Sequence, residues 1–492
     1  MPKIRKTGTK EVGFVTQSQD YLLFLEGLPT AKLNDIIVDS KGHRALITAL
    51  EEEKIEAWML DNFHPKPGET FTISPQGLRL SLQYNLFGRV INPLGVPLDG
   101  KAGLPPDGQE IDLDMIAPGI DTRELITEQF YTGLIAVDTL LPIGKGQREL
   151  IYGEPRSGKT PFLLDIIIHQ KEQKRICIYN AIGRSEVDVK QFSENLTKYG
   201  GNSYTIIVAA TSSDSAPLIA IAPAVACSIA DHYRNLGKDV LLIFDDLASH
   251  SKYMREIALL AGRIPGRESY PADIFYQHSH LVERAGNFNE KLGKGSITLL
   301  PVIETDIENF TSLIPTNVMS MTDGHLLFSA LLRAQGQYPA IEVDRSVTRV
   351  GRQTQKFIHK VLSDRIRSLL ADFHELQRFS RFGTELTGQT QLIIKRGKIT
   401  DELIRQEALT YIPPQAQIML LSLVFSGFFD EKDITWVKKF KETVIKELDA
   451  QSFKEIKDAI EKDTLEDLIE KLKSKHKILE DKCQPLETSK TS

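Results

Sequence analysis

Residues 153–160 have the types and spacing of a loop that binds phosphate groups. They are Gly153, Glu154, Pro155, Arg156, Ser157, Gly158, Lys159 and Thr160, which fit Gly-x4-Gly-Lys-Thr. Small residues let consecutive backbone N–H groups curl around phosphates, the lysine reaches the outer phosphates, and the threonine hydroxyl can ligate Mg²⁺. The loop therefore predicts that the protein binds a nucleotide such as ATP or ADP, together with Mg²⁺.

An aspartate at the end of an apolar run is the expected partner of this loop. Residues 240–244 are all apolar and lead directly to Asp245. Such a run suits a central parallel strand, and ligands bind at the carboxyl ends of strands in open α/β sheets. Taken alone, Asp245 would more often cap the following helix. Beside a complete phosphate loop, we expect it to orient Mg²⁺ through water.

A neighbouring predicted strand lacks the carboxylate that hydrolysis needs. That carboxylate orients the attacking water near the γ-phosphate. The strand predicted at 178–182 is followed by Gly183 and Arg184, and a guanidinium cannot accept a proton from water at neutral pH. Glu186 is either a substitute base or the partner of a neighbouring basic side chain. The protein is thus predicted to hold a nucleotide without hydrolysing it.

The elements around the loop have the pattern of an α/β domain. Residues 149–152 predict a buried strand, and the apolar positions between 162 and 168 predict a helix whose N-terminus points at the phosphates. Pro161 fits the first turn of that helix, where its missing N–H is not needed. Further strands are predicted at 176–179, 205–208 and 297–300. Strands alternating with helices indicate a mainly parallel sheet.

The two ends of the sequence have different patterns. Short apolar segments separated by turn formers occur at 12–15, 21–25, 35–38 and 44–47, and the Pro/Gly-rich residues 65–68 close this stretch. After about residue 355 a helical periodicity takes over, as in 361–370, and a charged helical pattern from about 454 runs into a frayed tail. We expect a small antiparallel β-barrel over 1–75, a P-loop (RecA-like) nucleotide-binding domain over 76–354, and a C-terminal α-helical domain over 355–492.

Composition supports a multi-domain globular protein. The 492 residues are 41% hydrophobic and 26% charged, and 60 basic against 66 acidic residues leave a charge of −6, so nothing indicates a nucleic-acid surface. Three widely spaced cysteines, Cys177, Cys227 and Cys483, fit a reducing compartment and neither a disulfide framework nor a metal site. We find no apolar run long enough to span a bilayer and no signal peptide, so membrane association is expected only through partners.

These segments resemble the alpha/beta chains of F-type ATP synthases, and among them the alpha subunits. The resemblance runs from about residue 13 to the final helices. Besides the phosphate loop, it is densest in GRVINPLGVPLDG at 88–100, PGRESYP at 265–271, IPTNV at 314–318 and SVTRVG at 346–351. The order of barrel, nucleotide-binding domain and helical domain is also what the resemblance implies.

The resemblance implies a non-catalytic, regulatory subunit of a rotary ATP synthase, an H⁺-transporting two-sector ATPase that makes ATP from ADP and phosphate with a transmembrane ion (proton) gradient. The implied partners are catalytic beta subunits in an alternating hexameric ring, a central stalk (gamma) subunit and a peripheral stalk. The implied location is the cytoplasmic face of the cell membrane. Residues 264–271 resemble the stretch that forms part of the bearing around the shaft.

The resemblance also implies a role for a second arginine, Arg349. It would reach the nucleotide on the adjacent beta subunit, and Ser346 would help to place it. A guanidinium delivered to a γ-phosphate stabilises transition-state charge. Outside this resemblance, Arg349 would be a surface salt-bridge partner. In catalytic relatives the position of Arg184 holds the glutamate that orients water.

Several positions depart from the family. Tyr338-Pro339 stands where Arg-Pro is usual, and Tyr338 either stacks on the adenine or is a core tyrosine. Of two glutamines usual near the base, Gln406 is retained and Ala408 replaces the other, which predicts relaxed nucleotide selectivity. Arg156 either adds positive charge near the phosphates or faces solvent. The barrel pattern starts about a dozen residues after Met1, which puts the usual stator attachment in question.

Two alternatives remain at this point. One is a subunit of a soluble F1-like motor that is not coupled to ion flow, which these residues hardly distinguish from a synthase subunit. The other is a catalytic homohexamer, such as an export-apparatus ATPase or a ring helicase. Arg184 argues against the homohexamer because each of its subunits must supply its own carboxylate.

Overall fold

The structure is a computed structural model in which the chain forms two compact units. It describes residues 11–447 except 53, 76, 83, 106, 107, 112, 114, 307, 308 and 381–387, together with 458 and 464–481. The first unit comprises Met1–Leu125, Lys145–Pro155 and Gln170–Asp323. The second comprises Ile126–Gly144, Arg156–His169 and Gly324–Ser492.

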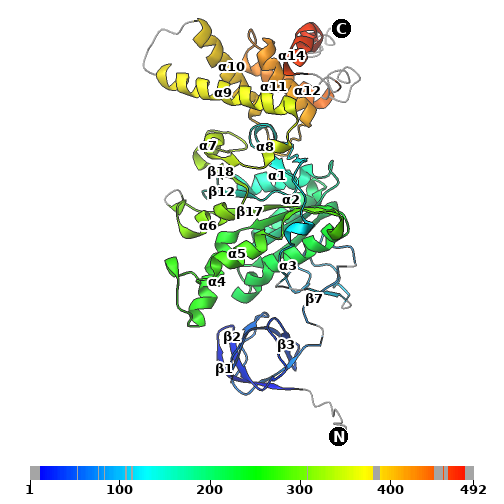
Figure 1. Cartoon of the computed structure of the whole chain (residues 1–492), viewed down its shortest axis with the longest axis vertical. Coiled ribbons are helices and arrows are strands. Elements are labelled where there is room, and N and C mark those ends of the chain that lie inside the picture. Colours follow the sequence, from blue (N-terminus) through cyan, green and yellow to red (C-terminus); the bar gives the residue numbers. More distant parts are fainter. Residues whose placement is uncertain are drawn as a thin grey trace, which may run out of the picture. The chain divides into compact units, whose positions relative to one another are not determined.

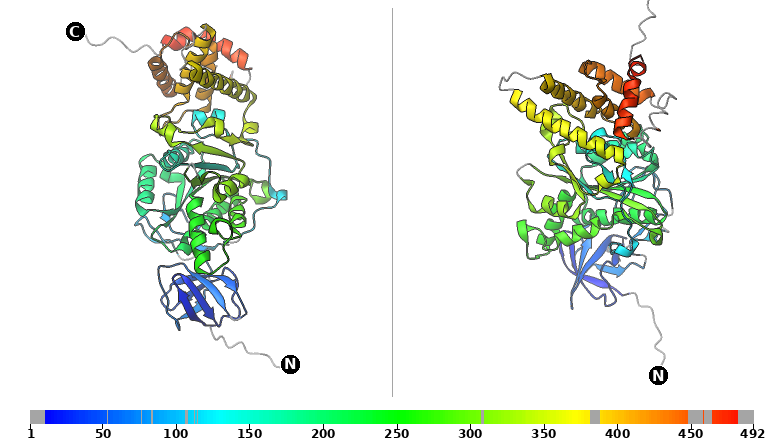
Figure 2. Two further views of the ribbon diagram at one scale, coloured as in Figure 1. Left: turned by 90° about the vertical axis from the view of Figure 1, so that its left-hand side faces the viewer. Right: turned by 45° about the horizontal axis from the view of Figure 1, so that its top comes forward.

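A closed antiparallel barrel begins the first unit, as expected (Figures 1 and 2). Its strands follow the order β1-β2-β5-β4-β3-β6. Their bounds are β1 Gly13–Gln19, β2 Leu22–Glu26, β3 Ile36–Asp39, β4 Arg44–Leu50, β5 Ile55–Met59 and β6 Thr70–Ile73. Strands β5 and β6 were not among the predicted segments, and β6 follows the Pro/Gly-rich residues 65–68 but lies within the predicted barrel domain of 1–75. The short strand β6 pairs with both β1 and β3 and buries Phe71 completely, so it completes the ring.

A parallel sheet forms the centre of the first unit. Its strands follow the order β12-β17-β15-β13-β14-β8, and neighbouring strands pair in parallel. Their bounds are β8 Val90–Ile91, β12 Glu149–Gly153, β13 Ile176–Arg184, β14 Thr205–Thr211, β15 Asp239–Asp245 and β17 Ser296–Glu304. Nearly every residue of these strands is buried, as a sheet covered on both faces requires. The predicted mainly parallel sheet of an α/β domain is thereby confirmed.

Helices of the first unit pack against this sheet. They are α2 Glu186–Lys198, α3 Ala216–Asn235, α4 Leu247–Leu260 and α6 Leu313–Met321, whereas α5 Ile274–Val282 contacts α3 and α6. Helix α3 contacts β13, β14 and β15, while α4 contacts α3 and β17. By length and composition, α3 is the one helix of the described residues that could cross a bilayer, which the sequence-based expectation overlooked. Because 83% of its apolar window is buried inside the protein, α3 is a core helix here.

Smaller elements connect these parts of the first unit. Strand β7 Arg79–Leu80 pairs with β9 Gln109–Glu110, and β16 Gly286–Asn287 pairs with β17. The short 3-10 helices are η1 Ile120–Thr122, η3 Gly201–Tyr204, η4 Arg267–Ser269 and η5 Glu290–Leu292. Cys177 and Cys227 are free and buried, whereas Cys483 lies outside the described residues.

The second unit contains the helix after the phosphate loop and the C-terminal helices. Its strands are β10 Gln129–Phe130, β11 Ile143–Gly144, β18 Gly324–Phe328 and β19 Val347–Thr348, and its short helical turns are η2 Ala136–Leu140 and η7 Val343–Arg345. Its α-helices are α1 Lys159–His169, α7 Ala330–Ala334, α8 Gly351–Thr354, α9 Phe357–Ser380, α10 Gly388–Ile404, α11 Pro414–Ser426, α12 Ile434–Glu447, α14 Leu465–Ser474 and α15 His476–Asp481. Helix α11 is almost wholly buried and contacts α9, α10, α12 and α14. The predicted C-terminal helical domain is confirmed, and half of the predicted tail beyond 454 lies outside the described residues.

Candidate functional site: a phosphate loop, a base pocket and two arginines

The phosphate loop connects β12 to α1, as the sequence predicted. All five residues of β12 are buried, and α1 begins at Lys159. Within the loop Gly153, Ser157, Gly158 and Lys159 are buried, Glu154 is half-buried, and Pro155, Arg156 and Thr160 are exposed. The Lys159 ammonium lies 3.4 Å from the Ser157 hydroxyl. Of the two alternatives for Arg156, the exposed side chain agrees with the one facing solvent.

Helix α1 carries one buried carboxylate on its apolar face. Asp165 is fully buried, and its Oδ1 accepts a hydrogen bond from the Leu409 backbone N–H at 3.0 Å. Its Oδ2 accepts a hydrogen bond from the Tyr338 hydroxyl. Burial raises the pKa of Asp165 to about 6, and these two hydrogen bonds oppose that shift. Asp165 was not among the predicted site residues, although a carboxylate inside the apolar run 162–168 was a usable signal.

The residues assigned to the base lie together in the second unit. Tyr338 is only 5% exposed, and the Arg333 guanidinium lies 5.4 Å from its ring centroid. Pro339 is buried next to it. The Gln406 side-chain amide donates to the Gly133 carbonyl at 2.8 Å and accepts from the Ile135 N–H at 3.2 Å. These contacts agree with the core-tyrosine alternative for Tyr338 and show that Gln406 anchors backbone.

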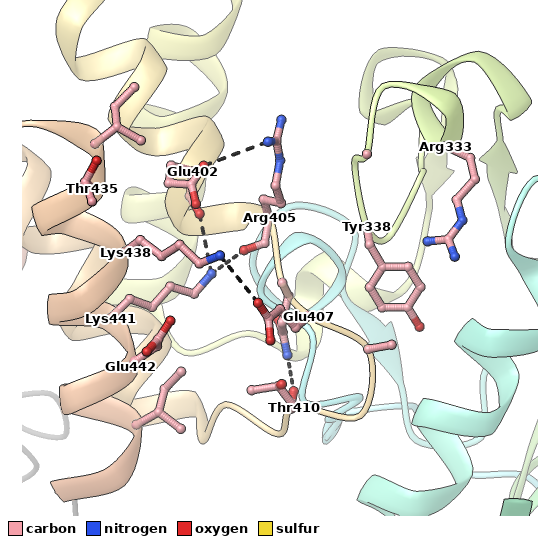
Figure 3. A pocket seen from close by; sticks show the side chains of 15 residues that line it. Arg333, Tyr338, Glu402, Arg405, Glu407, Thr410, Thr435, Lys438, Lys441 and Glu442 are labelled. Atoms are coloured by element: carbon pink, nitrogen blue, oxygen red, sulfur yellow. Dashed lines mark hydrogen bonds and ion pairs between the residues drawn. The ribbon is translucent and has the colours of Figure 1, made fainter.

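A cavity of about 650 Å³ opens beside these residues. It is lined by Arg333, Gly336, Tyr338, Glu402, Arg405, Gln406, Glu407, Ala408, Thr410, Ile434, Thr435, Lys438, Lys441, Glu442 and Ile445. Figure 3 shows Tyr338 and Arg333 on one side of it, and Lys438 and Lys441 on the other. Burial lowers the pKa of Lys441 to about 8. An aromatic ring, apolar patches and several charged groups give the cavity the chemistry to hold a base and sugar.

A cluster of charged side chains occupies the carboxyl edge of the parallel sheet. The guanidinium of Arg184 donates to Oδ1 of Asp245, and the Tyr179 hydroxyl donates to Oδ2 of Asp245 at 2.5 Å. The same guanidinium lies 3.5 Å from Oδ2 of Asp246. The register of β13 and β15 pairs Ala181 with Asp245, which brings the end of β13 beside that carboxylate. Arg184 is therefore an internal ion-pair partner and not an isolated basic residue.

Burial and charge act against each other in this cluster. Asp245 and Asp246 are 1% and 3% exposed. Burial disfavours the charged form of Arg184, but the carboxylates of Asp245 and Asp246 outweigh it and raise the pKa of the guanidinium above its ordinary value. Burial also raises the pKa of Asp246, an effect that Arg184 opposes. The guanidinium of Arg184 is consequently held in its charged form by the two carboxylates beside it.

In this structure Asp245 contacts protein groups, and its predicted role as a support for Mg²⁺ stays a prediction. Both of its carboxylate oxygens already accept hydrogen bonds, and its charge is balanced by Arg184. In the described part of the protein, no group of three or more His, Cys, Asp or Glu side chains could hold a metal ion. The alternative role, capping the next helix, belongs to Asp246, which accepts from the Ser249 N–H at 2.5 Å at the start of α4.

Glu186 does not take the place of the missing carboxylate within this cluster. It is the first residue of α2, is exposed, and accepts a hydrogen bond from the Ser213 hydroxyl at 2.7 Å. Glu186 therefore pairs with a hydroxyl group, where the sequence predicted a basic side chain as its partner. Among the described residues, Glu186 has no ion pair with an arginine or lysine.

The second arginine, Arg349, has the opposite surroundings. It is exposed and makes no hydrogen bond or ion pair with the residues that the structure describes. Ser346, which precedes it by three residues, is buried. The Ser346 hydroxyl donates to the Glu342 carbonyl at 2.7 Å and accepts from the Leu327 N–H at 3.0 Å. Ser346 therefore fixes the backbone that presents Arg349.

The structure brings some predicted residues together and keeps others on separate elements. Gly153 and Asp245 end parallel strands at one sheet edge, where Arg184 joins them. Tyr338, Pro339 and Gln406 gather beside the cavity, and Asp165 links α1 to them. Tyr179 and Asp246 were missed because nothing in the sequence shows that they share a cluster with Arg184.

Comparisons with known proteins find the same family along nearly the whole sequence. The model of the ATP synthase alpha/beta family nucleotide-binding domain matches residues 133–348, and that of the C-terminal domain of ATP synthase alpha/beta chains matches residues 353–478. The protein is 37% identical over 469 residues to ATP synthase subunit alpha of Caldanaerobacter subterraneus subsp. tengcongensis, which covers 95% of this sequence and 92% of the relative. It is 38% identical over 438 residues to ATP synthase subunit alpha of Neorickettsia sennetsu, which covers 87% and 86%.

Proposed function

The chain belongs to the ATP synthase alpha/beta family, and we propose that it acts as the non-catalytic, regulatory alpha subunit of a rotary F-type ATP synthase. In this proposal the loop 153–160 holds the phosphates of ATP or ADP, and the cavity beside Tyr338, Pro339 and Gln406 receives the base. Thr160 is exposed at the start of α1, where its hydroxyl could ligate Mg²⁺.

One observation carries the non-catalytic assignment. At the position of the water-orienting carboxylate stands Arg184, and its guanidinium is bound to Asp245. A guanidinium held in an ion pair offers no acceptor for a proton of water. A nucleotide bound by this subunit would therefore lack a general base. The same observation disfavours a catalytic homohexamer.

The catalytic contribution of this subunit would be made to a neighbour. Arg349 is exposed, lacks a partner among the described residues and stands on backbone fixed by Ser346. We infer that it reaches the nucleotide of an adjacent beta subunit and stabilises charge in the transition state there. An arginine already paired within its own subunit could not do so without first losing its partner.

The wider assignments follow from membership of the complex. We propose an alternating hexameric ring with catalytic beta subunits, a central stalk (gamma) subunit enclosed by it, ion (proton) coupling through membrane partners, and a place on the cytoplasmic face of the cell membrane. The 264–271 segment is proposed to face the shaft, and Ile264 in it is 90% exposed. The division at residues 75 and 354 is proposed as the domain organisation.

Nucleotide binding and turnover by the purified full-length protein test the proposal. We expect the protein to bind radiolabelled ATP and to release it without hydrolysing it over multiple turnovers. Lys159→Met is the matched control, because it removes the ammonium expected on the outer phosphates and should weaken binding by at least about tenfold. Multi-turnover ATPase activity of the isolated subunit, lost in Lys159→Met, would contradict the non-catalytic assignment.

A further inference from the structure

The cluster at the sheet edge supplies its own positive charge. In nucleotide sites of this kind a divalent cation lies between acidic protein groups and the phosphates and neutralises both. Here the guanidinium of Arg184 contacts Asp245 and lies 3.5 Å from Asp246. Both carboxylates are therefore balanced, at least in part, by a cation that belongs to the protein itself.

This cluster lies on the edge from which the phosphate loop departs. Strand β12 pairs in parallel with β17, β17 with β15, and β15 with β13, so all four strands end at the same edge. Gly153, the last residue of β12 and first of the loop, pairs with Glu304 of β17. Phosphates bound where the loop leaves β12 would thus meet the edge that carries Arg184.

Arg184 retains hydrogen-bonding capacity in this arrangement. A guanidinium has five N–H donors in a planar fork, a geometry that suits phosphate oxygens. Its Nε lies buried without a hydrogen-bond partner in the described part of the protein, and the side chain is 22% exposed. The side chain is therefore held at Nη2 by Asp245 and Asp246, and its partial exposure leaves an anion room to approach the guanidinium.

We propose that Arg184 replaces the divalent cation at this edge, so that the protein binds ATP or ADP with nearly the same affinity with and without Mg²⁺. The inference rests on the proposed nucleotide-binding function and specifies the charge partner of that site. Without Arg184, the carboxylates of Asp245 and Asp246 would repel the phosphates unless a metal ion bridged them. The hydroxyl of Thr160 could still contact a metal ion, but affinity would no longer depend on it.

Nucleotide affinity of the purified full-length protein, measured by titration calorimetry in Mg²⁺ and in excess EDTA, tests this. For the wild-type protein we expect the two dissociation constants to agree within about threefold. Arg184→Gln should lose at least about tenfold in affinity in EDTA, with Mg²⁺ restoring part of the loss. Arg184→Lys keeps the charge and should lose less in EDTA than Arg184→Gln.

Two further variants complete the test. Arg263→Gln removes an exposed arginine that pairs with Glu56 at 2.9 Å, and it should bind like wild type. Asp245→Asn keeps the guanidinium and removes the carboxylate, so it should still bind nucleotide in EDTA. If Arg184→Gln fails to fold, Asp245→Asn still tests whether Arg184 or a metal ion provides the positive charge. In a site where Asp245 supports a metal ion, Asp245→Asn would lose the part of the nucleotide affinity that depends on Mg²⁺.

The outcomes separate the inference from the function on which it rests. A wild-type protein that binds in Mg²⁺ and loses about tenfold or more in EDTA would overturn the role of Arg184 and leave nucleotide binding intact. Failure to bind ATP and ADP in both conditions would instead overturn the proposed function. Equal affinity of Arg184→Gln and wild type in EDTA would show that the guanidinium contributes nothing to the site.

Discussion

Arg184 and Arg349 are the same residue type in opposite surroundings. Arg184 ends a strand of a buried parallel sheet, and its charge is compensated by two carboxylates of its own subunit. Arg349 follows a short strand, is exposed, and has no hydrogen-bond or ion-pair partner in the described structure. The comparison teaches that the role of an arginine depends on its partners, because Arg184 balances carboxylates within its own subunit whereas the guanidinium of Arg349 has no such partner among the described residues.

The two arginines are also held in place by different contacts. Arg184 is held directly, through its own side chain, by Asp245. Arg349 is positioned indirectly, because the hydroxyls of its neighbours Ser346 and Thr348 hydrogen-bond to the backbone of Leu327 and Pro142 and leave its guanidinium unengaged. The proposed action of Arg349 on a neighbouring subunit requires a guanidinium that is not already paired within its own subunit. Three predictions test this contrast, in order of decreasing effect.

Removal of the exposed arginine should affect turnover and spare binding. In a ring reconstituted with catalytic beta subunits, Arg349→Ala should lower steady-state ATP hydrolysis by about 10³-fold or more, because the neighbour's transition state loses its positive charge. Nucleotide binding to this subunit should not change. Arg345→Ala, which removes an exposed arginine paired with Glu342 at 3.2 Å, is the control and should hydrolyse normally. Unchanged hydrolysis by Arg349→Ala would end the contrast between the two arginines.

The backbone that presents Arg349 depends on a glycine. A Cβ added at Gly351 would lie 1.5 Å from the carbonyl oxygen of Pro142, which also accepts a hydrogen bond from Thr348. Gly351→Ala should therefore lower the free energy of unfolding by about 1–3 kcal/mol or more and impair hydrolysis in the ring. Gly388→Ala is the control, since its Cβ would meet nothing within 4 Å. Thermal unfolding that is equal for both variants would contradict this account.

The smallest effect is expected at the internal arginine's cluster. Tyr179→Phe removes the hydroxyl bound to Asp245 and keeps the ring that stacks on Phe192. The free energy of unfolding should fall by about 1–2 kcal/mol, while Arg184 stays paired and nucleotide binding without Mg²⁺ persists. Tyr199→Phe, on a partly exposed tyrosine, should be neutral. Denaturant titrations of the two variants compare their free energies of unfolding. A loss of nucleotide binding without Mg²⁺ in Tyr179→Phe would show that the tyrosine, and not Arg184, provides the role assigned to Arg184.

Local patterns explain why some parts of the fold were predictable. The strand before the phosphate loop, the helix after it and the apolar strand ending at Asp245 each follow from consecutive residues. The barrel was predicted as a type of fold, but β6 was not, because a four-residue strand after a Pro/Gly-rich stretch has too little periodicity of its own. Its pairing with β1 and β3, which identifies it as a barrel strand, is a long-range contact.

The partners of charged side chains were the least predictable part of the site. Asp245 and Asp246 are adjacent, yet one pairs with Arg184 and the other caps α4. Which carboxylate does which depends on the register of β13 and β15 and on where α4 begins. Likewise, the bond from Tyr338 to Asp165 joins residues far apart in the sequence, so Tyr338 remained either a stacking or a core residue on sequence alone.

The sequence by itself determined that a phosphate loop exists, that a strand beside it ends in arginine instead of a carboxylate, and that a second arginine lies in SVTRVG. These are properties of residue type and spacing. Only the tertiary structure decided that Arg184 is neutralised by Asp245 and that Arg349 is left without a partner among the described residues. The reason is physical: a charge is compensated by what lies within a few ångströms of it, and strand register and packing set those distances.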